Sequence, residues 1–95
     1  MAVQINFFSL LKLELNQSQV EYEVEKKTKI KDIIARLDQQ FAGEFSRRLL
    51  EENKNKIKMG TIVLLNGHNI IHLAGLETEV EDGDKIAIFP PAAGG

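Results

Sequence analysis

The chain has 95 residues, of which 43% are hydrophobic and 27% are charged, a balance typical of one small globular domain. Its formal net charge of −2 supplies no basic excess for a nucleic-acid platform, and no apolar run reaches transmembrane length or forms a signal peptide. The absence of cysteine excludes disulfides, thiolate metal sites and cysteine catalysis. We therefore expect a cytoplasmic protein that binds neither nucleic acid nor membrane.

The first half of the chain predicts a strand hairpin. Val3, Ile5 and Phe7 alternate with polar residues, which predicts a strand with these three facing the core and Phe8 on the opposite face. After a loop with a turn signal at 16–19, a second strand is expected over 20–24, pairing antiparallel with the first.

An amphipathic helix follows, with Thr28 as its expected N-cap and Gly43 as its stop. Its apolar stripe has helical spacing and consists of Ile30, Ile33, Ile34, Leu37 and Phe41. A shorter second helix is expected over 44–53, with Phe45 and Leu49 on one side.

The second half predicts three more strands. The run 61–65 is rich in β-branched residues, and Asn66-Gly67 after it is a tight-turn signal. A short returning strand is expected over 69–73. A turn at 82–84 precedes the last strand, 85–89, whose Ile86 and Ile88 face inward and whose Phe89 faces outward.

This order predicts an α+β fold of the β-grasp, ubiquitin-like type. It has a mixed sheet of four to five strands, one main helix on one face and the last strand in the centre. Residues 1–89 form the domain, and residues 90–95 an extended tail.

The tail ends the chain with Pro90, Pro91, Ala92, Ala93, Gly94 and Gly95. The prolines cannot continue a hydrogen-bonded ladder and favour an extended backbone, while the glycines permit close approach to another surface. Beyond them the only reactive group is the Gly95 carboxylate. The pattern favours delivery of that carboxylate into a partner's active site over a chance composition of the chain end.

With this tail, the chain resembles the MoaD/ThiS family of ubiquitin-like sulfur carriers, and the MoaD branch most closely. Three stretches carry the resemblance: 3–8, ending in two aromatics; Leu65-Asn66-Gly67; and 81–91 running into Gly94-Gly95. The segment 44–59 is longer and more charged than in a minimal member.

The resemblance implies that a ubiquitin-activating-type adenylyltransferase uses ATP and Mg²⁺ to adenylate Gly95, which a sulfur donor then converts to a thiocarboxylate. In the MoaD branch the sulfur goes to a pterin precursor inside a large catalytic synthase subunit, in a heterotetramer, during molybdenum or tungsten cofactor biosynthesis. The chain would be a carrier and not an enzyme, with no bound cofactor and no metal. His68 and His72 lack a third ligand and are interpreted as surface residues.

Partner docking is expected on the sheet face that the helix leaves uncovered, through Phe8, Ile70 and Phe89. The alternative is that Phe8 and Phe89 pack on each other or under the 11–15 loop. Three other functions stay open: a protein modifier joined to lysines through Gly95, a thiamin-type sulfur carrier, and a binding module for which the tail is dispensable.

Overall fold

The computed structural model describes residues 2–8, 12–13, 15–52 and 55–91. Five strands share one sheet: β1 (Val3–Phe7), β2 (Gln19–Tyr22), β3 (Ile62–Leu65), β4 (His68–Asn69) and β5 (Lys85–Phe89). The described residues include the helices α2 (Ile30–Gln40) and α3 (Glu44–Leu49) and 3₁₀ helices over Ile70–His72 and Gly75–Glu77. Within the expected first loop, Lys12, Leu13 and Leu15 are helical.

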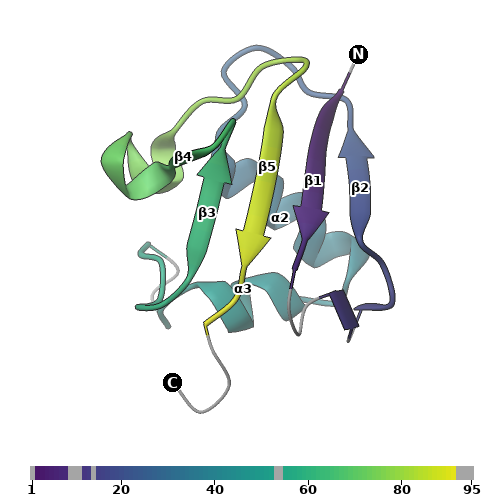
Figure 1. Cartoon of the computed structure of the whole chain (residues 1–95), viewed down its shortest axis with the longest axis vertical. Helices are drawn as coiled ribbons and strands as arrows, with labels where there is room; N and C mark the ends of the chain where they lie inside the picture. Colours follow the sequence, from purple (N-terminus) through teal and green to yellow (C-terminus); the bar gives the residue numbers. More distant parts are fainter. Residues whose placement is uncertain (1, 9–11, 14, 53–54, 92–95) are drawn as a thin grey trace.

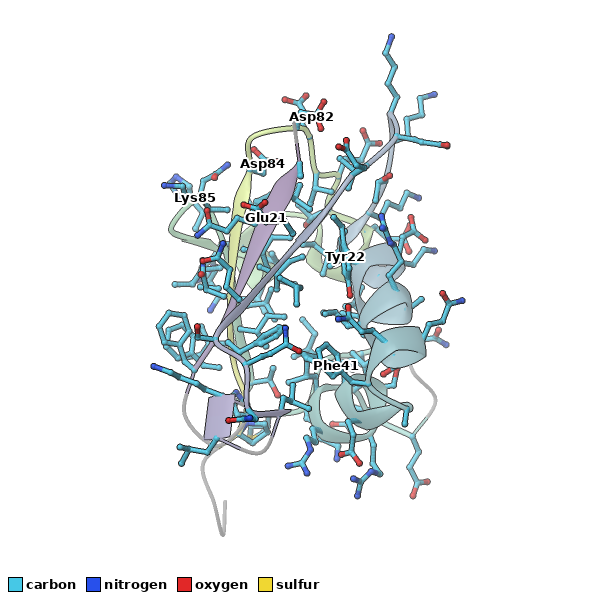
Figure 2. The ribbon with its side chains drawn as sticks, turned by 90° about the vertical axis from the view of Figure 1, so that its right-hand side faces the viewer. Glu21, Tyr22, Phe41, Asp82, Asp84 and Lys85 are labelled. Carbon is cyan, nitrogen blue, oxygen red and sulfur yellow. The ribbon has the colours of Figure 1, made fainter. Side chains whose placement is uncertain are left out.

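The strand order is β2-β1-β5-β3-β4, with β5 in the centre (Figure 1). β1 pairs antiparallel with β2 and parallel with β5, and β3 pairs antiparallel with β5 and β4. Helices α2 and α3 both lie on one face of the sheet (Figure 2), and neither of them covers the other face. This is the β-grasp fold, and the predicted architecture is confirmed.

The core lies between the sheet and α2. The alternation in β1 buries Val3, Ile5 and Phe7, and the alternation in β5 buries Ile86 and Ile88. The helical stripe of α2 meets them, because its 3.6-residue period places four apolar residues on one side: Ile30, Ile33, Ile34 and Leu37 are all buried. These predicted core residues are confirmed.

An aromatic cluster closes the core at the C-terminal end of β1. The Phe7 ring meets Phe41 edge-on at 6.0 Å and Phe45 at 5.2 Å. The Asp38 side chain joins the two helices, because its carboxylate accepts from the Ser46 backbone N–H at 2.8 Å and from the Ser46 hydroxyl. α3 is thereby fixed under the sheet, and Phe45 and Leu49, which were predicted to share one side of this helix, are both fully buried.

The second helix was expected to reach residue 53 and ends at Leu49. Both predicted boundaries of the main helix are also wrong. The N-cap of α2 is Lys29 and not Thr28, because the Asp32 carboxylate accepts from the Lys29 N–H at 2.9 Å. The helix ends before Gly43: Ala42 takes the left-handed conformation with φ 57°, and the Gly43 N–H donates to the Asp38 carbonyl at 2.8 Å. This bond closes the helix by a Schellman-type turn.

The predicted strand 69–73 is also wrong. Only His68 and Asn69 pair with β3, and the chain then turns into a 3₁₀ helix. The Asn69 side chain caps this helix by accepting from the Ile71 N–H at 3.1 Å. The strand alternation is lost there, so Ile70 turns into the core and is 0% exposed, whereas its neighbour Ile71 is 62% exposed.

Among the described residues, neither helix is long and apolar enough to cross a membrane.

Candidate functional site

The base of the tail continues directly from the central strand. β5 ends at Phe89, the predicted last residue, where Phe89 pairs with Ile62 of β3. Pro90 and Pro91 follow and are half-buried, and without N–H groups they cannot extend the ladder. The remaining predicted tail positions, Ala92 to Gly95, lie outside the described residues.

The uncovered sheet face carries an apolar patch at its tail end, formed by Phe8, Ile62 and Phe89 and called here the aromatic patch. The Phe8 and Phe89 rings are stacked with centroids 4.5 Å apart and planes 11° apart. The Phe8 N–H donates to the Ile88 carbonyl at 3.2 Å, which continues the β1–β5 pairing by one residue. Phe8 is 38% exposed and Ile62 41% exposed. The rings therefore pack on each other and still leave apolar surface facing solvent.

Of the three predicted docking residues, the structure brings Phe8 and Phe89 together and excludes Ile70. The prediction that Ile70 projects onto the uncovered face is wrong, because the 3₁₀ turn buries it. Ile62 takes part instead and was missed. Its signal was available: the alternation in 61–65 places Ile62 opposite buried Val63, on the same face as Leu64.

The other end of the same face is polar. The strand register sets Glu21, Gln4 and Lys85 in one row across β2, β1 and β5, with Glu21 and Lys85 exposed. Figure 2 shows Glu21 and Lys85 toward the end of the sheet that is remote from the tail. The face is thus apolar beside the tail and charged away from it.

A side-chain network fixes the start of β5. Asn66 has φ 50° and Gly67 φ 86°, the left-handed pair of a type I′ hairpin turn. The Asn66 side chain accepts from the Lys85 N–H and donates to the Asp84 carboxylate, both at 2.9 Å. The same carboxylate accepts from the Glu81 N–H at 2.8 Å. The β3–β4 turn is thereby joined to the strand that carries the tail.

The edge strand β2 is held to α2 by a cation–π contact. The Arg36 guanidinium carbon lies 4.2 Å from the centre of the Tyr22 ring, and the Tyr22 hydroxyl donates to Gln40. Burial raises the pKa of Tyr22, and the nearby Arg36 charge opposes this shift. These contacts hold α2 against β2 on the sheet face opposite the aromatic patch.

Charged clusters elsewhere are ion pairs. Glu77 bonds Lys29 at 2.7 Å and Lys31 at 2.8 Å, and these two lysines lower its pKa to about 2. The Glu44 pKa is lowered by its hydrogen bonds to Arg48 and Arg47. No three His, Asp or Glu side chains among the described residues are placed to hold a metal ion.

Comparison with known proteins agrees with this geometry. Residues 5–95 match the model of the ThiS family. The chain is 30% identical over 95 residues to small archaeal modifier protein 3 of Haloferax volcanii, covering 100% of both chains. It is 34% identical over 85 residues to a protein of Archaeoglobus fulgidus described as "Putative sulfur carrier protein", covering 90% of this chain and 93% of that one.

Solved structures show the same fold. The solution structure of the Haloferax volcanii HVO 2177 protein superposes with a TM-score of 0.81 at 30% identity, covering 100% of this chain and 87% of that one. A chain of the Amycolatopsis orientalis BexX/CysO complex superposes with a TM-score of 0.76 at 30% identity, covering 99% and 100%. The β-grasp sheet, the aromatic patch beside the tail and the match over residues 5–95 together lead to one conclusion: the chain belongs to the ThiS family of ubiquitin-like sulfur carriers.

Proposed function

We propose that the chain carries sulfur on Gly95 and donates it to a pterin precursor, as the small subunit of a molybdopterin-synthase-like complex. The observation that carries this proposal is the position of the tail base. Pro90 and Pro91 leave the central strand directly beside the solvent-facing aromatic patch. A partner that docks on the patch therefore receives the tail at the edge of its own interface.

Gly95 is loaded with sulfur in two steps. The Gly95 carboxylate attacks the α-phosphorus of ATP on an adenylyltransferase that holds Mg²⁺, forming an acyl adenylate and releasing pyrophosphate. A sulfide sulfur then attacks the acyl carbon and displaces AMP, leaving a thiocarboxylate. The adenylate is needed because a carboxylate repels nucleophiles and has no good leaving group. In this proposal the chain supplies no base and acts only as carrier; the synthase subunit performs the transfer to the pterin.

The experiment is intact-mass spectrometry after incubation with the activating enzyme, Mg·ATP and sulfide. We expect a mass gain equal to the exchange of one oxygen for sulfur, and no gain in a chain that lacks Gly95. Addition of the large synthase subunit and pterin precursor is then expected to return the original mass. Absence of any gain with an enzyme proven active on another carrier would refute the proposal.

A second candidate is protein modification, in which the activated Gly95 is joined to lysine amines of other proteins. The observation that favours it is the 30% identity with small archaeal modifier protein 3 over the whole chain. Tryptic digestion of affinity-purified adducts distinguishes the two. Because the last basic residue of the chain is Lys85, modification leaves the remnant 86–95 on target lysines, whereas a dedicated sulfur carrier leaves none.

A further inference from the structure

The turn that precedes β3 lies against the base of the tail. It spans Lys58 to Thr61 and is closed by a hydrogen bond from the Thr61 N–H to the Lys58 carbonyl at 3.1 Å. Gly60, at its third position, has φ 90°, which is typical of a type II turn. A Cβ on Gly60 would lie 3.7 Å from the Pro91 Cβ, so the turn and the tail base are in van der Waals range.

The same turn is fixed to α3. The Lys58 N–H donates to the Leu49 carbonyl at 2.8 Å, and the Lys58 ammonium donates to the Arg47 carbonyl at 2.7 Å. Both carbonyls belong to the C-terminal end of α3, where a lysine cation is favourable. Leu49 is 0% exposed, so α3 is seated in the core.

We propose that the Lys58–Thr61 turn positions the base of the tail. The long segment between α3 and β3, which contains this turn, would then serve to hold the tail in place. The contacts form a series from the core to the tail: α3 holds Lys58, the turn holds Gly60, and Gly60 lies against Pro91. Lys58 and Gly60 act through Pro91 and do not touch the reacting carboxylate. This inference rests on the proposed activation of Gly95.

The energetic reason lies in proline geometry and in the sensitivity of reactions to distance. The Pro91 ring fixes its own φ, which removes one of the two rotations by which the chain after it can change direction. A tail that already points toward the partner loses less freedom on binding. Conversely, a displacement of about 1 Å at a reacting group can reduce a rate by up to about a hundredfold.

The test uses two pairs of matched variants. Gly60→Val forces a β-branched residue onto φ 90°, which such residues do not adopt, and so drives the turn out of its conformation. Gly67→Val imposes the same strain at φ 86° in the β3–β4 turn, at the end of β3 away from the tail. Lys58→Met removes the ammonium contact to Arg47 and keeps the stem, and Lys56→Met removes the same charge two residues earlier.

In adenylation kinetics with the activating enzyme, we expect Gly60→Val to lower kcat/KM about tenfold relative to Gly67→Val at comparable stability. Lys58→Met is expected to lower it several-fold relative to Lys56→Met. Equal kcat/KM within each pair would overturn the proposal. If Gly60→Val does not fold, the comparison of kcat/KM between Lys58→Met and Lys56→Met is sufficient to test the proposal.

Nuclear magnetic resonance tests the geometry without any enzyme. We expect nuclear Overhauser contacts between Gly60 and Pro91 in the unaltered chain. The amide resonances of Ala92 and Ala93 should shift in Lys58→Met and stay in place in Lys56→Met. If the unaltered chain is not adenylated, the proposed function fails, while these spectra still decide the positioning role. Absence of the contact, or equal tail spectra in the two lysine variants, would refute it.

Discussion

The Asn66–Asp84 hydrogen bond leads to a prediction that can be worked through in energy. Asn66 donates to Asp84 and accepts from the Lys85 N–H, each at 2.9 Å. Asn66→Asp keeps the acceptor but replaces the donor with a second carboxylate facing Asp84. Adding Asp84→Asn reverses the polarity of the pair. The amide introduced at position 84 can donate to the carboxylate introduced at position 66 and still accept from the Glu81 N–H, as Asp84 does at 2.8 Å.

The expected size follows from these contacts. A hydrogen bond to a charged group contributes about 1.5–3 kcal/mol, and two like charges about 4 Å apart repel by about 1 kcal/mol in water. Asn66 is exposed, so the lower values apply. We expect Asn66→Asp to lower the free energy of unfolding by about 2 kcal/mol, and the double variant to recover at least about half of that loss.

The assay is urea denaturation of the four proteins of this double-mutant cycle at pH 7. A coupling energy of about 1–2 kcal/mol is expected, with unchanged dependence of the unfolding free energy on urea concentration. A coupling energy below about 0.5 kcal/mol would mean that the network is incidental.

Three further predictions concern the neighbouring residues Ile70 and Ile71, the aromatic patch, and the loss of stability at acid pH. Ile70→Ala should lower the free energy of unfolding by about 2–5 kcal/mol and Ile71→Ala by less than about 0.5 kcal/mol, because only Ile70 is buried. Equal losses in urea denaturation would contradict the assigned burial. Phe89→Ser should weaken binding to the activating enzyme at least tenfold in calorimetry, whereas Ile71→Ser, which removes an exposed isoleucine outside the patch, should not. Because the folded-state pKa of Glu77 is lowered to about 2 from 4.5, its stabilisation is complete above pH 4.5 and is lost as pH falls from there toward 2. Glu77→Gln should flatten the thermal stability profile over that range, and an unchanged acid slope would exclude Glu77 as its source.

The sequence predicted most of the fold because its main elements follow strong periodicities. The alternation at 3–7 and 85–89 and the helical stripe from Ile30 to Leu37 identify the same residues that the structure buries. Asn66-Gly67 predicted the hairpin turn for a physical reason, since both residues tolerate positive φ.

The failures arise where a side chain competes with a backbone pattern. Asn69 ends β4 by accepting from the Ile71 N–H, which no periodicity over 69–73 reveals. Ile70, predicted as a docking residue, was therefore assigned to the wrong face. Ile62 was overlooked although the alternation of its own strand indicates its face. The contact of Gly60 with Pro91 joins residues 31 positions apart, so it requires the assembled sheet to be seen.

The central place of β5 also has a mechanical consequence. β1 and β5 are parallel neighbours, so the start of β1 and the tail base lie at opposite ends of the sheet (Figure 1). Tension between Val3 and Pro91 therefore acts along the strands, and the β1–β5 hydrogen bonds must slide past one another together instead of opening singly. Forced unfolding is governed by the rate of that concerted rupture. A pull on the tail base along the strand direction is thus borne by several β1–β5 hydrogen bonds at once.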